Sequence, residues 1–183
     1  MSAPADLVCI AGVSGAGKDV VGRHLEDRHG FERVAFADPI KLAVMALFQL
    51  SPSQLWGEKR NEPDVRLGAS PRSVFQRFGQ ACTEIDPEVW IRPFVARVQD
   101  ARRRGARVVC TDLRTRAELE CARVLGASLW LVIRPGAGAP GALALHQTER
   151  MLSEGPEARF DRILRNEGTL EELCQAVSRA LGP

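Results

Sequence analysis

The chain has 183 residues, of which 45% are hydrophobic and 26% charged, with a formal net charge of +2 at pH 7. This length suffices for one domain with its own core, and no apolar run approaches the length of a bilayer span. The mild charge argues against a nucleic-acid-binding surface, and five scattered cysteines without a CxxC pair argue against a disulfide framework or a zinc site. We therefore expect one domain over residues 1–183, in a cytoplasmic protein without nucleic-acid or membrane partners.

Short apolar runs alternate with helix-like segments along the chain. The predicted strands are Leu7–Ala11, Arg33–Phe36, Arg107–Cys110, Ser128–Ile133 and Phe160–Arg165. The predicted helices are Lys18–His29, Pro39–Gln49, Pro71–Gln80, Glu88–Arg104, Arg116–Leu125, Leu143–Leu152 and Leu170–Leu181. Two segments of turn composition, Ser51–Ser70 and Pro135–Gly141, interrupt the alternation. The pattern predicts an α/β fold with a parallel sheet covered by helices on both faces.

A glycine-rich segment directly follows the first predicted strand and opens the first predicted helix. Its residues are Gly12, Val13, Ser14, Gly15, Ala16, Gly17, Lys18 and Asp19. Glycines in this context let backbone N–H groups turn toward phosphate oxygens, and the lysine reaches the β- and γ-phosphates of a nucleotide. The alternative is a strand-to-helix turn without a ligand. Asp19 stands where this motif usually has Ser or Thr, and its carboxylate is a candidate ligand for Mg²⁺, directly or through water.

Asp112 and Arg114 follow the third predicted strand. Ligands of parallel α/β sheets bind outside the carboxyl ends of the strands, so both side chains are expected to lie toward the glycine-rich loop. There Asp112 would position a metal-bound water or receive a proton, and Arg114 would hold the phosphate of an acceptor. The alternative interpretation is an Asp that caps a helix and an Arg on the helix surface.

Three further places carry polar residues at predicted strand ends or on one helix face. Lys41 is a candidate phosphate contact or a surface lysine. Arg72 and Gln76 are one helical turn apart and therefore share a face of the helix. This face either contacts a phosphate or a base edge, or is solvated. The turn from Asn166 to Gly168 follows the last predicted strand and either lies against an adenine or only connects strand to helix.

Beyond the Pro/Gly segment, His146, Glu149 and Arg150 are interpreted as polar contacts of a lid or hinge. His146 and Glu149 alone make a poor metal site, because nothing nearby supplies a third ligand. Arg134 or Arg150 is expected to approach the transferred group when the lid closes.

Six blocks in this order resemble the phage-type deoxynucleoside monophosphate kinase family over nearly the whole chain. They are Gly17-Lys18-Asp19, Phe36-Ala37-Asp38-Pro39 with Lys41, Gly68-Ala69-Ser70-Pro71-Arg72 with Gln76 and Gly79, Thr111-Asp112-Leu113-Arg114 with Glu118, His146-Gln147-Thr148-Glu149, and Asn166-Glu167-Gly168-Thr169. The resemblance implies an adenylate-kinase-like three-layer P-loop kinase fold with a five-stranded parallel sheet, using ATP and Mg²⁺. The implied reaction converts a (deoxy)nucleoside monophosphate to its diphosphate.

The resemblance also implies a division of roles along the chain. Lys18, Asp112 and Arg114 would be catalytic, and ATP would be bound by the glycine-rich loop with Asn166 and Gly168. The acceptor would be held by a segment over about residues 38–92, and a lid would cover about residues 134–156. The acceptor-binding residues are expected to be Asp38, Lys41, Arg72, Gln76 and Arg114.

Two other functions stay open from the sequence. The animal-type phosphomevalonate kinases are similar at the Gly-Lys-Asp loop, the Asp-x-Arg after a strand and a late Asn, which favours another small-molecule phosphate as acceptor. A non-catalytic P-loop protein that binds a nucleotide as a regulator is the second alternative, although no Asn-Lys-x-Asp segment specifies guanine. The base, the sugar and the oligomeric state, with a homodimer as one option, are not fixed by these motifs.

Overall fold

The computed structural model describes residues 5–138 and 159–182. The chain divides into two compact units, one formed by Met1–Ala35 with Val95–Pro183 and the other by Phe36–Phe94. The predicted helix Leu143–Leu152 and most of the expected lid lie outside the described residues. Among the described residues, no helix is long and apolar enough to cross a membrane.

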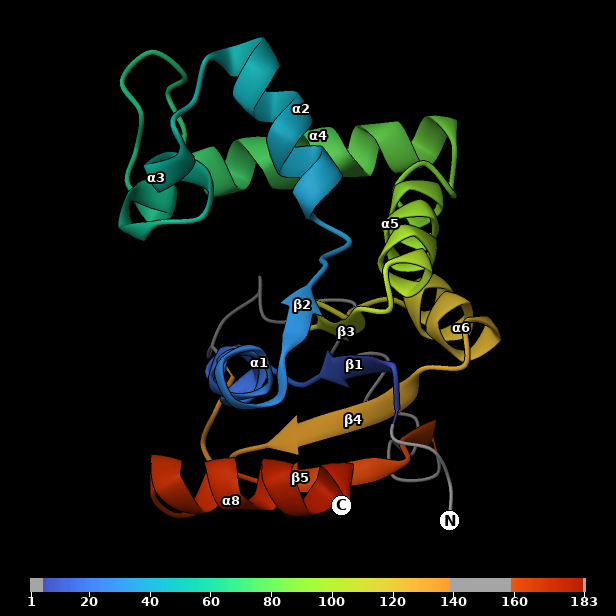
Figure 1. Cartoon of the computed structure of the whole chain (residues 1–183). Coiled ribbons are helices and arrows are strands. Elements are labelled where there is room, and N and C mark those ends of the chain that lie inside the picture. The colour runs from blue at the N-terminus through green and yellow to red at the C-terminus, as the bar shows by residue number, and fades with distance from the viewer. Residues whose placement is uncertain (1–4, 139–158, 183) are drawn as a thin grey trace. The chain divides into compact units, whose positions relative to one another are not determined.

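The first unit is built on a parallel sheet with the strand order β2-β3-β1-β4-β5 (Figure 1). The strands are β1 (Leu7–Ala11), β2 (Phe31–Arg33), β3 (Arg107–Cys110), β4 (Ser128–Ile133) and β5 (Arg162–Arg165). Strand β1 lies in the centre, where Cys9 pairs with Cys110 on one side and with Leu129 on the other. All five β1 residues are buried, as expected for a strand covered on both faces. The predicted five-stranded parallel sheet is confirmed.

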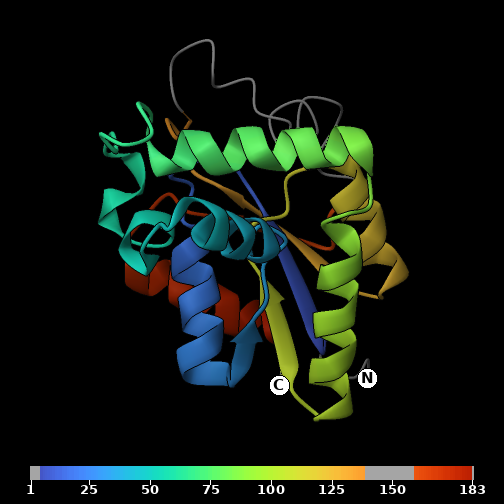
Figure 2. The ribbon, with the colours of Figure 1, turned by 90° about the horizontal axis from the view of Figure 1, so that it is seen from above.

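Helices cover both faces of this sheet (Figures 1 and 2). Helices α1 (Lys18–His29) and α8 (Leu170–Leu181) lie on one face, and α6 (Arg116–Val124) lies on the other together with α5 (Ile91–Arg103) from Val95 onward. The apolar residues of α1 and α8 meet those of the sheet in one core cluster, which includes Val8, Ile10, Val21, Leu25, Trp130, Leu173 and Val177. Helix α8 begins with a capping box in which the Thr169 and Glu172 side chains and backbone N–H groups satisfy one another.

Two predicted strands start at the wrong residue. The strand predicted over Arg33–Phe36 is β2, which begins at Phe31 directly after the left-handed cap at Gly30 and pairs Phe31 with Arg107. The apolar run that suggested the strand is buried and its Val34 backbone N–H donates to the Val109 carbonyl, but the residues in register with β3 are Phe31–Arg33. At the other edge, β5 begins two residues later than Phe160.

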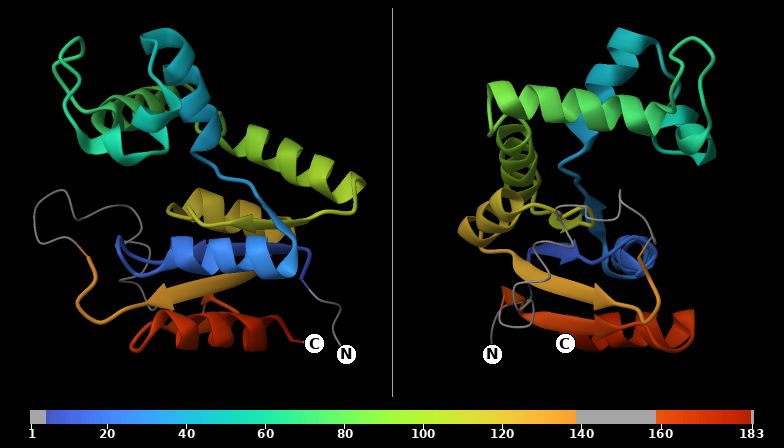
Figure 3. Two further views of the ribbon diagram at one scale, coloured as in Figure 1. Left: turned by 60° about the vertical axis from the view of Figure 1, so that its left-hand side comes forward. Right: turned by 180° about the vertical axis from the view of Figure 1, so that it is seen from behind.

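The second unit is helical, as Figure 3 shows. It contains α2 (Asp38–Phe48), α3 (Pro52–Leu55), the 3₁₀ helix η1 (Glu58–Asn61) and α4 (Pro71–Ile85). A small core of Val44, Leu50 and Leu55 is joined by partly buried aromatic and aliphatic neighbours, among them Phe75 and Phe78. The turn-rich segment Ser51–Ser70 therefore holds two short helices that its composition did not predict.

Helix α4 runs five residues beyond the predicted end at Gln80, through Gly79. A glycine in the interior usually weakens a helix, but a Cβ at Gly79 would lie 3.2 Å from the Ile40 side chain, so the glycine permits close packing of α2 on α4. The Trp90 indole donates to the Gly79 carbonyl at 3.1 Å and adds a further contact there. Helix α5 starts at Ile91, three residues later than predicted, because the residues after Asp86 form a turn.

Candidate functional site

The glycine-rich loop joins β1 to α1, and its shape depends on glycine. Gly12, Gly15 and Gly17 have φ values of 150°, 78° and 109°, which side chains rarely adopt. A Cβ at Gly12 would also lie 2.5 Å from the Val132 carbonyl oxygen. Ala16 is fully buried and anchors the loop in the core, while Ser14 and Gly15 are exposed. The sequence thus builds a fixed turn whose tip lies in solvent at the N-terminus of a helix.

Lys18 is the first residue of α1, and its side chain folds over the loop. The ammonium donates hydrogen bonds to the carbonyl oxygens of Gly12 at 2.7 Å and Val13 at 2.8 Å. Burial lowers the pKa of Lys18, and the positive charge of Arg114 lowers it further, whereas Asp19 and Asp112 act in the opposite direction. The lysine therefore interacts electrostatically with three of the charged residues that the sequence singled out.

Asn166 ties the end of β5 to the glycine-rich loop. Its side chain is buried and donates to the Ala16 carbonyl at 2.9 Å, and its backbone N–H donates to Ile133 at the end of β4. A Cβ at Gly17 would lie 2.7 Å from the Asn166 amide nitrogen, so the two residues are in close contact. Asn166 is therefore a structural partner of the loop, and exposed Gly168 forms the turn into α8.

Asp112 follows β3 and is 9% exposed. Its carboxylate accepts a hydrogen bond from the Cys110 thiol at 3.2 Å. Burial raises the pKa of Cys110, so the thiol keeps its proton and acts as the donor. The alternative interpretation of Asp112 as a helix cap is wrong, because α6 begins at Arg116 and is capped by Thr115.

Arg114 is exposed, but its backbone is held by Glu118 from the first turn of α6. One carboxylate oxygen of Glu118 accepts the backbone N–H groups of Arg114 at 2.6 Å and Thr115 at 2.8 Å. Burial raises the pKa of Glu118 to about 7; the charge of Asp112 also raises it, and the two N–H donors oppose the shift. Glu118 was part of a sequence block but was not singled out as a site residue. Its three-residue spacing from Thr115, as in a capping box, was the available signal.

The other expected acceptor residues lie in the second unit. Asp38 and Lys41 are on the first turn of α2, and Arg72 and Gln76 are on α4, one turn apart as predicted. The Lys41 ammonium lies 5.4 Å from the centroid of the Trp56 ring and 5.9 Å from that of Phe75. Trp56 also donates its indole N–H to Asp38 at 3.1 Å. Neither Trp56 nor Phe75 was predicted from the sequence as a site residue. The available signal was that Trp56 is a tryptophan within a polar segment.

Among the described residues, the expected site residues fall into two groups. Lys18, Asp19, Asp112 and Arg114 are brought together at the glycine-rich loop of the first unit. Asp38 and Lys41 belong to one cluster in the second unit. Of the lid residues, Arg134 is exposed after β4, whereas His146, Glu149 and Arg150 lie outside the described residues.

Comparison with known proteins identifies the family. A family model described as deoxynucleotide monophosphate kinase matches residues 64–177. A curated protein of Acanthamoeba polyphaga mimivirus, named "Putative deoxynucleotide monophosphate kinase", is 30% identical over 185 residues, with 93% of each chain covered. The chain belongs to the deoxynucleotide monophosphate kinase family. It is a phosphotransferase that uses ATP and acts on nucleoside monophosphates, and the phosphomevalonate-kinase-like and non-catalytic alternatives are not favoured.

Solved structures agree on the fold. The dephospho-CoA kinase from Campylobacter jejuni superposes with a TM-score of 0.58 at 10% identity, covering 96% of this chain and 95% of that one. The shikimate kinase from Acinetobacter baumannii in complex with shikimate gives a TM-score of 0.51 at 15% identity, with 96% and 92% covered. At these identities the likeness supports the P-loop kinase fold of this family member.

Proposed function

We propose that the protein transfers the γ-phosphoryl group of Mg²⁺-bound ATP to a deoxynucleoside monophosphate, with Lys18, Asp112 and Arg114 as the catalytic residues. The observation that carries this proposal is the glycine-rich loop with the Lys18 ammonium folded over it, 2.7 and 2.8 Å from two loop carbonyls, and with the charges of Arg114, Asp19 and Asp112 acting on the same lysine. Phosphoryl transfer depends mainly on positioning and on neutralising charge at the transferred group. The cations Lys18 and Arg114 would neutralise phosphate charge, and the carboxylates Asp19 and Asp112 would position a metal ion.

The residues of the loop are assigned to ATP. The backbone from Gly12 to Gly17 and the start of α1 would surround the β- and γ-phosphates, and Lys18 would exchange its bonds to the loop carbonyls for phosphate oxygens. Asn166 and Gly168 would lie on the adenine side of this site. Arg134 and the lid residues His146, Glu149 and Arg150 would approach the phosphates from the segment over residues 134–156.

The acidic residues fit a magnesium ion. Mg²⁺ in kinases uses one or two carboxylates together with substrate phosphates and water, and Asp19 and Asp112 are two carboxylates within electrostatic reach of Lys18. The described residues contain no cluster of three or more metal-binding side chains, so a site completed by phosphate oxygens is the arrangement that suits them. Asp19 is proposed as the ligand of the ion, which would supply positive charge to neutralise the phosphates.

The acceptor is assigned to Asp38, Lys41, Arg72 and Gln76 of the second unit, with Arg114 for its phosphate. Arginine offers a planar pair of donors that matches a phosphate, and Gln76 offers a donor and an acceptor to a base edge. Because the acceptor already carries a phosphate, the reaction needs no strong general base. Asp112 would orient the attacking phosphate oxygen.

ADP release tests the proposal. The purified protein is assayed with ATP and each common deoxynucleoside or ribonucleoside monophosphate, with phosphomevalonate as a control. Stimulation by deoxynucleoside monophosphates is expected, and Lys18→Ala should lower kcat/KM by roughly a hundredfold or more. Asp19→Ala should raise the Mg²⁺ concentration needed for activity, with partial recovery in Asp19→Ser. Stimulation by no nucleotide, or unchanged kinetics in Lys18→Ala, would overturn the assignment.

A further inference from the structure

An aromatic pair encloses one lysine in the second unit. Lys41 extends from α2 so that its ammonium lies 5.4 Å from the Trp56 ring centroid and 5.9 Å from the Phe75 ring centroid. Both distances are within the range of cation–π attraction. The Trp56 indole N–H donates to Asp38 at 3.1 Å, which fixes the ring from its edge. Three separate elements, α2, the end of α3 and α4, meet at this ammonium.

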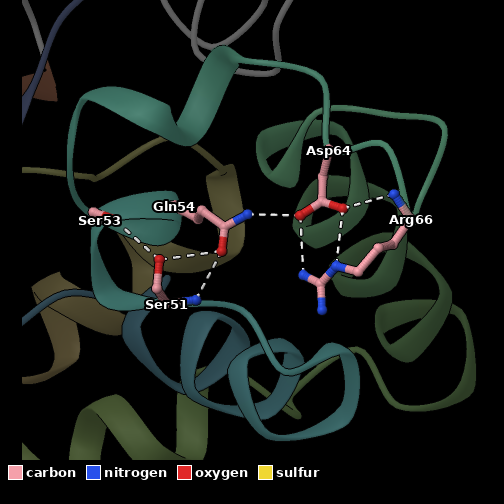
Figure 4. Close-up of polar contacts among 5 residues, drawn as sticks. All are labelled: Ser51, Ser53, Gln54, Asp64 and Arg66. Carbon is pink, nitrogen blue, oxygen red and sulfur yellow. Dashed lines mark hydrogen bonds and ion pairs between the residues drawn. The ribbon is translucent and has the colours of Figure 1, made fainter.

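A network of polar contacts lies in the segment that contains Trp56 (Figure 4). The side chain of Gln54 accepts the Ser51 backbone N–H at 2.9 Å and donates to Asp64 at 2.7 Å. Asp64 also accepts two hydrogen bonds from the Arg66 guanidinium, at 3.2 and 3.0 Å. The ion pair with Arg66 and the bond from Gln54 lower the pKa of Asp64 to about 2, so this carboxylate is charged at neutral pH.

Local contacts fix the chain at Trp56. Leu55, the residue before it, is fully buried in the small core of the second unit. The Trp56 backbone N–H closes the last turn of α3 at the Pro52 carbonyl, at 2.9 Å. Trp56 is 36% exposed, so part of it lies at the surface and is not buried in the core. A large ring held at the surface by its neighbours is suited to orienting another group.

The group that it orients is the Lys41 ammonium. A lysine side chain has a flexible four-carbon stem and loses much conformational freedom when its ammonium is held in one contact. Two ring faces reduce that freedom before the contact is made. An ammonium oriented in advance binds a phosphate at a lower entropic cost.

We propose that Trp56 is a positioning residue for the acceptor, which with Phe75 holds the Lys41 ammonium for the phosphate of the nucleoside monophosphate. This inference rests on the proposed function, in which Lys41 contacts the acceptor. Trp56 does not touch the reacting atoms in this role, and its effect depends on Lys41. The dependence separates a positioning role from direct stacking of the base on the indole ring.

A double-mutant cycle tests the inference. Trp56→Leu removes the ring face and keeps an apolar side chain; Trp56→Phe keeps a smaller ring face and removes the N–H donor to Asp38. Trp56→Leu should raise the KM for the acceptor about three- to fivefold, with kcat and the KM for ATP changed less than twofold. Trp56→Phe should recover most of the loss. In a Lys41→Ala background, Trp56→Leu should have no further effect on the acceptor KM.

Val65→Ala supplies the matched control, because Val65 is 98% exposed in the same segment and is not part of the network. Thermal melting of each variant checks that the second unit is folded. Equal effects of Trp56→Leu with and without Lys41, or an unchanged acceptor KM in folded Trp56→Leu, would show that the ring does not act through the lysine. Absence of nucleotide-stimulated ADP release in the wild type is the different result that refutes the proposed function itself.

Discussion

Replacement of Glu118 by Gln should change how stability depends on pH. Burial raises the pKa of Glu118 from 4.5 to about 7, with Asp112 as the second cause, so the folded chain holds this proton more tightly than the unfolded chain does. Between about pH 4.5 and 7 the folded state then binds more protons, and the free energy of unfolding falls as the pH rises. A tenfold difference in proton affinity corresponds to about 1.4 kcal/mol, so the contribution lost by pH 8 is about 3 kcal/mol.

Urea unfolding followed by circular dichroism at half-unit steps from pH 4.5 to 8 measures this contribution. Glutamine keeps an oxygen that accepts the Arg114 and Thr115 N–H groups but does not titrate, so wild-type stability should decline relative to Glu118→Gln as the pH rises. Glu120→Gln on the same helix is the matched control, since Glu120 is exposed and its ion pairs with Arg116 and Arg123 are long, at 4.0 Å. Parallel curves for wild type and Glu118→Gln would refute the reasoning.

Three substitutions at close contacts have distinct expected outcomes. Gly22→Ala should destabilise the fold by about 1–2 kcal/mol in urea unfolding, because the new methyl would lie 2.4 Å from the Thr111 side chain. Asn166→Ala should leave the buried Ala16 carbonyl without its bond, with a loss of about 1–3 kcal/mol and a higher KM for ATP. His29→Asn should lose less stability than wild type in calorimetric scans below pH 6.5, because the pKa of His29 is lowered in the folded state, chiefly by burial, and its protonation favours unfolding.

The first unit was largely predictable from the sequence because each of its signals is local. The β1 strand, the glycine-rich loop and α1 are contiguous, and their boundaries depend on burial of neighbouring residues and on Gly30 as a cap. The location of Asp112 after β3 also follows from the general rule for parallel sheets. The predicted bounds of β2 were wrong because the buried run Val34–Phe36, which suggested the strand, lies beyond the residues Phe31–Arg33 that pair with β3.

The second unit was less predictable because its determinants are far apart in the sequence. Trp56 lies 18 residues from the carboxylate that holds its indole N–H, and Gln54 lies 10 residues from Asp64. No periodicity links such residues, and a four-residue helix is too short to show one. The close packing of Ile40 of α2 against Gly79 of α4 is likewise a contact between residues far apart in the sequence.

The difference between the two units leads to a last prediction, on local stability. The strands β1, β3 and β4 are almost completely buried, whereas the segment over residues 51–66 of the second unit has one fully buried apolar residue, Leu55, and several polar contacts with partly exposed side chains. Elements with little buried apolar surface open at lower free energy. Amide hydrogen exchange followed by mass spectrometry should therefore be faster in peptides from residues 51–66 than in those from the three strands. Addition of a deoxynucleoside monophosphate should slow exchange in this segment of the wild-type protein. The slowing should be smaller in Trp56→Leu, because at a fixed ligand concentration a weaker ligand stabilises the bound conformation less. Equal protection of the strands and the segment before nucleotide is added would contradict this account of what holds the second unit together.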